Sequence, residues 1–288
     1  MAEKTSILAP KRRFLPIFAV FSAFLAIIGH FSPIFAEKSP PGLPWDDPPP
    51  ELWFPVGEEI DYEVYWGIFM VGEATSKAEW IERDGRRLLS LSMKAESNGL
   101  VEKLYPVRET LQTILDPATF LPLSFEKDSH EGKRHYRELT TFDHAAKKGH
   151  WKSLTKDKEK TFAIEADTRD LMGLMYWIRK EPIRAGETRN YWVMTDEKMY
   201  ELIVAAGKTE ELKLENYGKV PVVKMEPKGK FNGMFVRKGR MFLWISDDAR
   251  YVICRATASV PVASIKIALK KVRGPGDDFW TREPPKKK

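Results

Sequence analysis

DYEVYWGIFMVGEAT (residues 61–75) contains a change of pattern that indicates the fold. Up to Trp66, apolar and polar residues alternate, which is typical of a β-strand with one buried face. An unbroken apolar run from Ile68 to Val71 then follows, and Gly72 ends it. We interpret the segment as two strands joined by an apolar turn. The turn forms a buried bend, the lip of a ligand site, or a surface that touches a membrane or a partner.

The two strands around this turn predict a specific packing arrangement. The expected inward face of the first strand comprises Ile60, Tyr62, Val64 and Trp66, and that of the second comprises Gly72, Ala74, Ser76 and Ala78. Small residues opposite large ones either interdigitate or leave room for a ligand. The segment FNGMFV (231–236) repeats the combination of glycine and bulky apolar residues. We therefore expect the two turns to lie near each other, at the rim of a cleft or on a partner surface.

Alternation with a period of two continues along most of the chain, and glycine-containing dipeptides interrupt it. Strands are predicted at 59–67, 71–81, 87–97, 108–115, 121–130, 135–143, 149–154, 160–165, 189–195, 198–206, 209–215, 219–226, 231–237, 240–246, 250–258 and 262–272. Turns are predicted at Asp84-Gly85, Asn98-Gly99, Glu131-Gly132, Lys148-Gly149, Gly207-Lys208, Lys228-Gly229 and Lys238-Gly239. This pattern is typical of an antiparallel sheet.

One segment, at about 167–181, has the period of a helix instead. Leu171, Leu174, Met175 and Ile178 follow the spacing i, i+3, i+4, i+7. Asp167 or Thr168 is the expected N-cap, Asp170 adds negative charge in the first turn, and Pro182 ends the helix. A short helical turn is also expected around Leu100–Leu104. The predicted fold is therefore mainly β: a highly curved antiparallel sheet, incomplete barrel or sandwich, with one prominent packed helix.

The chain divides into four parts by composition. Residues 1–36 combine a short basic stretch, an apolar run and a candidate cleavage site, which indicates a signal peptide or, alternatively, an uncleaved anchor. Residues 37–52 form a proline-rich linker that disfavours a helix or an inner strand. Residues 53–272 form one β-rich domain, and 273–288 form a polar, basic tail. These features predict an exported protein.

The charge and cysteine content exclude several classes of protein. The whole chain has 47 basic and 41 acidic residues, but residues 1–36 account for four of the basic residues and one of the acidic ones. The remainder has a net charge of only +3, which argues against a nucleic-acid-binding protein. Cys254 is the only cysteine, so no internal disulfide and no cysteine zinc site can form. Cys254 is expected to be a small buried residue.

Recognisable catalytic motifs are absent. The sequence has no G-x-S-x-G serine motif and no H-E-x-x-H zinc motif, and Gly207-Lys208-Thr209 lacks the upstream glycine of a phosphate loop. His130 and His135 are expected to face each other across a hairpin, but the sequence shows no third metal ligand at a fixed spacing. We therefore predict no catalytic residues, no metal site and no cofactor. The two histidines are interpreted as an exposed polar pair.

Aromatic residues make up 12% of the chain. They either fill an ordinary core or line a cleft for a lipid or another apolar chain, with Arg108 and Arg179 as polar groups at its mouth. The candidate ligand or partner surface comprises Tyr62, Trp66, Ile68, Phe69, Met70, Tyr105, Arg108, Met175, Tyr176, Arg179, Met234, Phe235 and Trp244.

Four segments in order carry a resemblance to a known family. They are FPVGEEIDYEVYWGIFMVGEA (54–74), SNGLVEKLYPVRETLQTILDP (97–117), RDLMGLMYWIR (169–179) and FLWISDDAR (242–250). Together they resemble the bacterial exported family known as domain of unknown function 3108. The chain departs from the family pattern at Gly173 and after Arg250, where Tyr251-Val252 replaces the usual continuation.

The resemblance implies a curved sheet with a helix and a location in the periplasm or cell envelope of a Gram-negative-type bacterium, but no reaction. By fold-level analogy only, this arrangement is similar to periplasmic lipoprotein carriers of the LolA–LolB type. We expect a non-enzymatic protein that binds an apolar or amphipathic ligand in a cleft between sheet and helix. The alternatives are a structural or assembly partner of an envelope complex and an enzyme with a site that the sequence does not reveal. Membrane contact is expected only through an uncleaved N-terminus or the apolar turns.

Overall fold

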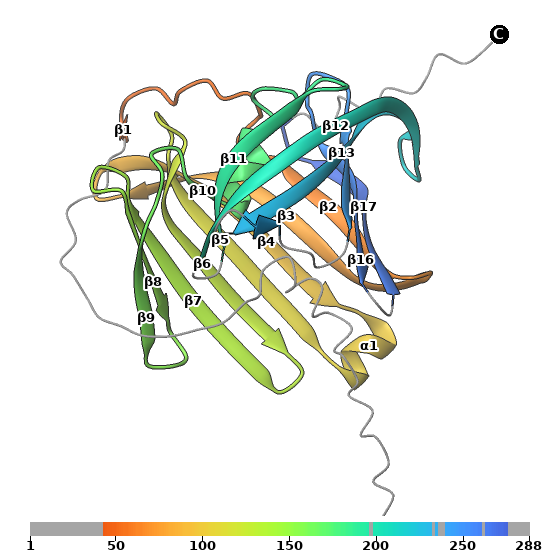
Figure 1. The fold of residues 1–288 in the computed structure, drawn as a ribbon, viewed down its shortest axis with the longest axis horizontal. Coiled ribbons are helices and arrows are strands. Elements are labelled where there is room, and N and C mark those ends of the chain that lie inside the picture. The colour runs from red at the N-terminus through yellow and green to blue at the C-terminus, as the bar shows by residue number, and fades with distance from the viewer. Residues whose placement is uncertain (1–42, 196–197, 232–233, 236–239, 261–262, 276–288) are drawn as a thin grey trace, which may run out of the picture.

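Seventeen strands in the described part of the chain join into one strongly curved sheet (Figure 1). The structure is a computed structural model that describes residues 43–195, 198–231, 234–235, 240–260 and 263–275. The predicted signal peptide or anchor, most of the C-terminal tail and the first part of the linker lie outside these residues.

The first half of the chain forms an up-and-down meander. Its elements are β1 (Leu43–Pro44), β2 (Glu59–Trp66), β3 (Phe69–Arg83), β4 (Arg86–Ser97), α1 (Gly99–Leu104), β5 (Val107–Asp116), β6 (Leu121–Glu131), β7 (Arg134–Asp143), β8 (Lys148–Ser153) and β9 (Lys158–Ala163). Each strand from β2 to β9 pairs antiparallel with the next. The short β1 pairs with β4, so part of the proline-rich linker adds to the sheet.

The second half forms another meander that returns to the first. Its elements are β10 (Arg169–Asp170), α2 (Leu171–Trp177), β11 (Thr188–Thr195), β12 (Lys198–Leu214), β13 (Gly218–Phe231), β14 (Met234–Phe235), β15 (Met241–Ser246), β16 (Ile253–Val260) and β17 (Ala263–Arg273). Strand β10 is parallel to β11, and the pairings from β11 to β17 are antiparallel. The last strand, β17, pairs with β2 and thereby joins the two halves.

The sheet is barrel-like but incomplete, as predicted. Within the described residues, β9 and β10 do not pair with each other. Register shifts in the β2–β3, β5–β6, β12–β13, β15–β16 and β17–β2 pairs bend the strands, because a bulge increases local twist. Figure 1 shows β11 to β13 folded over toward the strands of the first half.

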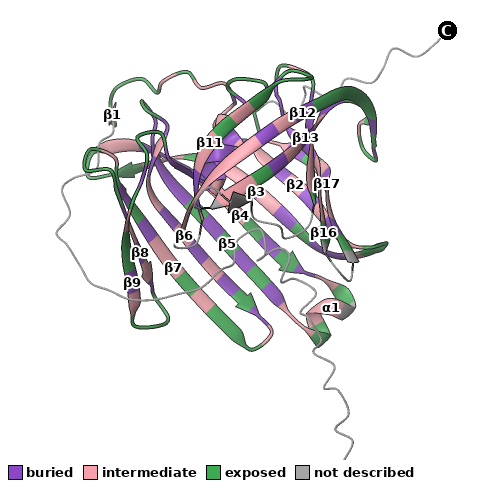
Figure 2. Cartoon of the chain, viewed as in Figure 1, coloured by how far each residue is buried: buried purple, intermediate pink, exposed green. Residues whose placement is uncertain are grey.

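Helix α2 lies inside the curve and contacts β4 and β5 of one wall and β11 of the other. Met172 and Tyr176 belong to the apolar core shared with β4 to β8. Leu174 and Ile178 belong to the core shared with β11 to β16. The helix therefore buries two of its faces, which explains why its sequence is apolar over a wide arc. Figure 2 shows buried and exposed residues alternating along the strands, as expected for a sheet with one covered face.

The structure confirms several details predicted from the sequence. Tyr62 lies opposite Ala74, and Asp84 and Gly85 both have positive φ, as a tight hairpin turn requires. Helix α1 occupies the predicted short helical segment. Asp248 accepts hydrogen bonds from the backbone N–H groups of Arg250 and Tyr251 and so caps the turn between β15 and β16.

Other predictions are wrong in detail. The long helix at 167–181 shortens to Leu171–Trp177, and its N-cap is Asp170 rather than Asp167 or Thr168. Gly207-Lys208 is not a hairpin turn but a bulge within the continuous strand β12. Lys228-Gly229 likewise lies inside β13, because both residues pair with β12. In both cases the neighbouring strand supplies pairing that overrides the local turn preference.

Candidate ligand-binding cleft

Helix α2 begins at a capping residue that is itself fully buried. The Asp170 carboxylate accepts a hydrogen bond from the backbone N–H of Gly173 at 3.0 Å and another from the Thr113 hydroxyl of β5 at 2.6 Å. The first bond satisfies a free N–H of the helix start, and the second ties the helix to the sheet. A Cβ at Gly173 would lie 3.2 Å from Asp170 Oδ2, so the glycine gives the carboxylate room.

Burial raises the pKa of Asp170 to about 6, although the hydrogen bonds from Thr113 and Gly173 favour the charged form. The second carboxylate oxygen, Oδ2, is buried and has no hydrogen-bond partner among the described residues. Removal of this oxygen from water without a compensating hydrogen bond is unfavourable. The helix start is therefore held by a carboxylate that burial drives toward its neutral form.

An aromatic segment holds the other side of α2. The Trp53 indole N–H donates to the backbone carbonyl of Tyr176 at 2.7 Å, and the Trp53 ring packs edge-on against Trp177. Phe54 packs edge-on against the Tyr176 ring at a centroid distance of 4.7 Å. The short helix is thus clamped between the residues that precede β2 and the inner face of the sheet.

An apolar cleft lies between α2 and the inner face of the sheet. It encloses about 1170 Å³ of empty space, including the part open to solvent. Its lining consists of Tyr62, Ala74, Met93, Leu111, Leu171, Met172, Leu174, Met175, Ile178, Leu202, Val204, Pro227, Met241, Leu243, Ile253, Ala256, Thr257, Ala258, Ile265 and Ile267. Of these side chains, only Tyr62 and Thr257 carry a polar group. Such a site favours an apolar molecule over a polar one.

Small residues on the sheet create much of this space. Ala74 on β3 lies opposite Tyr62, and Ala256 and Ala258 on β16 lie opposite Ile267 and Ile265 of β17. Four methionines line the cleft, and flexible thioether side chains adapt to irregular apolar surfaces.

A buried ion cluster lies next to the cleft. The Arg179 guanidinium binds both carboxylate oxygens of Glu58 and donates to the backbone carbonyl of Arg250 at 3.1 Å. Arg250 also donates to Glu58, at 3.2 Å. Burial opposes the charge on Arg179, but the adjacent Glu58 carboxylate outweighs this effect and raises the pKa of Arg179. Tyr176 packs against the Arg179 guanidinium.

A small recess adjoins this cluster and shares three lining residues with the cleft. It is lined by Ile60, Tyr62, Ser76, Met175, Tyr176, Arg179, Val252 and Ile253. Tyr62, Met175 and Ile253 line both spaces. The Tyr176 and Ser76 hydroxyls are hydrogen-bonded at 3.1 Å. Burial raises the pKa of Tyr176 to about 12 and that of Tyr62 well above its usual value, so both phenols are neutral at pH 7.

The structure separates the predicted site residues into groups. Tyr62 and Met175 line the cleft, and Tyr176 borders the recess. Arg179 also lies at the recess, but in the interior rather than at the cleft mouth where it was expected. Its partner Glu58 is 121 residues away in sequence, and no local pattern indicates this pair.

The remaining predicted residues lie away from the cleft lining. Leu243 lines the cleft, and the next residue of β15, Trp244, is buried on the other face of the strand. Trp66 and Tyr105 are partly buried and pack against the core cluster that contains Ile60 and Val64, but they do not line the cleft. Arg108 is exposed and pairs with Glu102.

The apolar turn at the start of β3 is exposed rather than a buried bend. Ile68 is 86% exposed and Phe69 is 68% exposed. Met70 is half-buried, and its sulfur accepts a hydrogen bond from Asn98. The side chains of Met234 and Phe235 lie outside the described residues, as do 232–233 and 236–239. The expected proximity of the two apolar turns therefore stays a prediction.

Most cleft residues were not singled out from the sequence. The alternation of Ala256 and Ala258 was a usable signal, because small side chains on one face of a strand leave space. Cys254 is buried as predicted, and burial raises its pKa to about 12, which leaves the thiol unreactive. Within the part of the chain that the structure describes, neither helix is long and apolar enough to cross a membrane.

Comparison with known proteins identifies the family. The family model described as "Protein of unknown function (DUF3108)" matches residues 61–270, which is most of the described sheet. The chain belongs to the DUF3108 family. This assignment confirms the resemblance carried by the four sequence segments. No curated protein shows a significant match to this DUF3108 chain.

Among solved structures, the DUF3108 chain is similar to a beta-barrel-like protein of domain of unknown function DUF1849 from Brucella abortus. The match has a TM-score of 0.53 and 12% identity, and covers 76% of this chain and 98% of that one. A putative lipoprotein from Parabacteroides distasonis matches with a TM-score of 0.30 and 9% identity, over 77% of this chain and 98% of that one. The first likeness supports the barrel-like fold alone, and the second carries no argument.

Proposed function

We propose that the protein binds the apolar part of an amphipathic molecule, such as a lipid, in the cleft between α2 and the sheet. The observation that carries this proposal is the cleft lining, in which 18 of the 20 side chains lack a polar group. Each methylene group removed from water stabilises the bound state by about 0.8 kcal/mol. A chain of several methylenes is therefore enough to offset part of the cost of association.

The neutral polar groups of the adjoining recess support an amphipathic ligand rather than a pure hydrocarbon. The hydroxyl groups of Tyr62, Tyr176 and Ser76 all lie on residues that line the recess. They offer hydrogen bonds to a polar end without an uncompensated charge. We further propose that the protein acts without catalysis, in the periplasm or cell envelope to which residues 1–36 would direct it.

The test is a titration of the purified full chain with cis-parinaric acid, a fluorescent fatty acid. The variants Ala256→Phe and Ala258→Phe place a ring in the cleft, and each should weaken saturable binding at least tenfold. Ala268→Phe is the matched control, because Ala268 lies on β17 opposite Arg255 and outside the cleft lining. Residues 1–42 are identical in all variants, so probe bound there does not affect the comparison.

Equal binding by the cleft variants and the control would contradict the proposal. So would the absence of saturable binding together with no co-purified lipid by native mass spectrometry. Far-UV circular dichroism of each variant shows whether the sheet is retained.

A second candidate function, a contact site for an envelope protein, is favoured by the exposed turn. Ile68 and Phe69 are among the most exposed large hydrophobic side chains of the described residues, and exposed apolar groups of this size often mark interaction sites. Crosslinking of envelope extracts with the wild type and an Ile68→Ser/Phe69→Ser variant tests this role. A crosslinked protein that the variant loses would support it, and identical patterns would exclude the turn as the contact.

A further inference from the structure

Three side chains with metal-binding groups meet on the outer face of the β6–β7 hairpin. His130 on β6 and His135 on β7 are directly opposite each other in the register. Asp128 lies two residues before His130, so its side chain points to the same face. Asp128 Oδ1 is 3.3 Å from His130 Nε2 and 2.9 Å from His135 Nε2. The sequence lacked an evident third ligand for the histidine pair, and the strand geometry supplies one.

We propose that Asp128, His130 and His135 bind a divalent transition metal ion such as Zn²⁺. The potential ligand atoms of the three residues all lie within 4.8 Å of one another. Zinc bonds of about 2.0–2.2 Å in a tetrahedral arrangement place neighbouring ligand atoms about 3.3–3.6 Å apart. The distances from Asp128 Oδ1 to the two ring nitrogens are within a few tenths of an ångström of this spacing.

Metal binding requires a small rotation of the rings. The two imidazoles are stacked, with centroids 3.9 Å apart and an interplanar angle of 12°. Their nitrogen lone pairs converge on one ion only if the rings turn apart. The side chains of His130 and His135 are 52% and 43% exposed, so solvent leaves space for this rotation.

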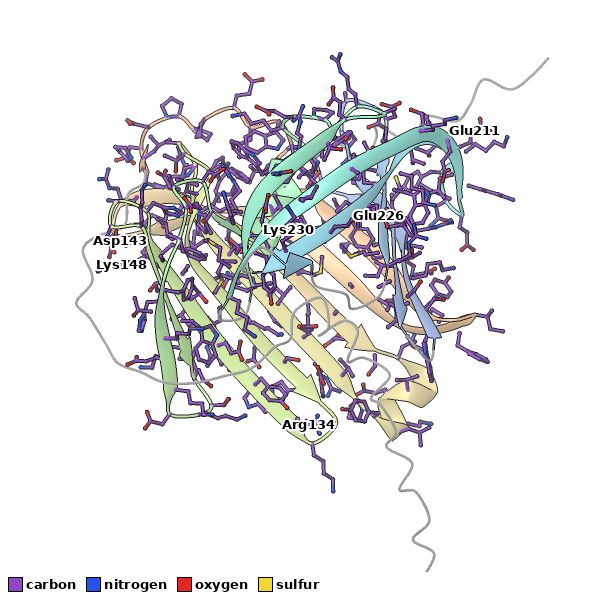
Figure 3. The ribbon with its side chains drawn as sticks, viewed as in Figure 1. Arg134, Asp143, Lys148, Glu211, Glu226 and Lys230 are labelled. Atoms are coloured by element: carbon purple, nitrogen blue, oxygen red, sulfur yellow. The ribbon has the colours of Figure 1, made fainter. Side chains whose placement is uncertain are left out.

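Arg137 lies near the second carboxylate oxygen of Asp128. Arg137 donates to Glu126 at 2.6 Å and lies 3.9 Å from Asp128 Oδ2. The Arg137 guanidinium thus neighbours the oxygen that faces away from the histidines, and leaves Oδ1 for the ion. Such outer groups typically orient metal ligands. The cationic Arg134, which Figure 3 labels at the tip of this hairpin, directly precedes His135 on β7, so the two side chains lie on opposite faces of the hairpin.

The ligand set indicates which ions bind. Two imidazoles and one carboxylate favour Zn²⁺, Ni²⁺ and Cu²⁺, whereas Mg²⁺ and Ca²⁺ favour sites made of oxygen atoms. Three protein ligands leave at least one coordination position open to water or another molecule. The site is on the outer face of the hairpin and is independent of the proposed ligand cleft.

The test is isothermal titration of the untagged full chain with ZnCl₂. We expect one saturable site that excess Mg²⁺ does not block. Loss of a residue that only contacts a metal ligand weakens metal affinity by about 10–100-fold. Loss of a ligand itself should weaken it at least as much, so His130→Ala, His135→Ala and Asp128→Asn should each weaken Zn²⁺ binding at least tenfold. The matched control is His150→Ala, because His150 lies on β8, bonded to Thr161, outside this group.

A second readout uses Co²⁺, whose visible absorption bands report its ligands and geometry. We expect bands typical of a four- or five-coordinate ion in the wild type and the His150→Ala variant, and their loss in the other three. The proposal is wrong if Zn²⁺ does not bind saturably to the wild type, or if the Asp128 and histidine variants bind it as tightly as the wild type. Urea unfolding of each variant separates loss of the site from loss of the fold.

Discussion

Replacement of Asp170 by asparagine tests whether the charged form of this buried carboxylate destabilises the folded protein. Burial raises the pKa of Asp170 in the folded protein to about 6, from an ordinary value of 3.8. Between these two pH values the unfolded state releases the proton and the folded state retains it. The contribution of Asp170 to the free energy of unfolding therefore falls as pH rises from about 4 to about 6, and does not change further above that range. A shift of about two pH units corresponds to about 3 kcal/mol.

Asparagine has nearly the same shape and does not titrate. We therefore expect the Asp170→Asn variant to gain about 3 kcal/mol relative to the wild type as pH rises from 4 to 7. The assay is equilibrium urea unfolding of the full chain at half-unit pH intervals, with the difference between variant and wild type plotted against pH. This difference removes the contribution of other titrating groups.

The control is Asp167→Asn, which changes an exposed carboxylate three residues away. The same urea titration of this control shows whether a pH-dependent difference is specific to the buried position. The reasoning is refuted if the difference in unfolding free energy between Asp170→Asn and the wild type is constant between pH 4 and 7. It is also refuted if the variant becomes less stable relative to the wild type as pH rises. Either result would mean that hydrogen bonds from Thr113 and the helix start outweigh burial.

Two further predictions concern buried groups. The Arg179→Met variant should lose about 3–5 kcal/mol of unfolding free energy in urea titrations, because Glu58 loses its main buried partner. The control Arg108→Met breaks an exposed pair with Glu102 and should lose less than about 1 kcal/mol. Equal losses in the two variants would show that burial of the first pair has no special weight. Cys254 should resist a thiol-reactive dye at pH 7 in the folded protein and react fully in urea, because burial raises its pKa to about 12 and shields it. Rapid labelling of the folded protein, monitored by mass spectrometry, would contradict this explanation.

Much of the sheet was predictable because its signals are local. Alternation locates most strands to within two residues, and Asp84-Gly85 forms the expected tight turn. Prediction failed where distant pairing decides the outcome. Gly207-Lys208 has the composition of a turn, but β13 pairs on both sides of it and keeps β12 continuous through a bulge. The helix was predicted too long because its apolar period extends past the residues that keep helical geometry.

The cleft was less predictable than the sheet. Its position between sheet and helix follows from the pattern, but its lining depends on which residues of remote strands face each other. Trp244 appeared equivalent to Tyr62 as an aromatic strand residue, yet the face of β15 that carries it is turned away from the cleft. Arg179 could not be placed without Glu58, and the proximity of Asp128 to the histidine pair could not be predicted without the hairpin register.

The pairing of β17 with β2 also has a consequence for folding kinetics. The side chains of Asp61 and Arg273 meet across this pair although they are 212 residues apart in sequence. During synthesis, β2 emerges early, and nearly the whole chain must follow before its second neighbour, β17, is available for pairing. Contacts of such long range slow folding, and an unpaired strand edge invites association with other chains. The interval before β17 emerges is therefore the period in which this protein is most vulnerable to aggregation, and in which a chaperone would have the greatest effect on its yield.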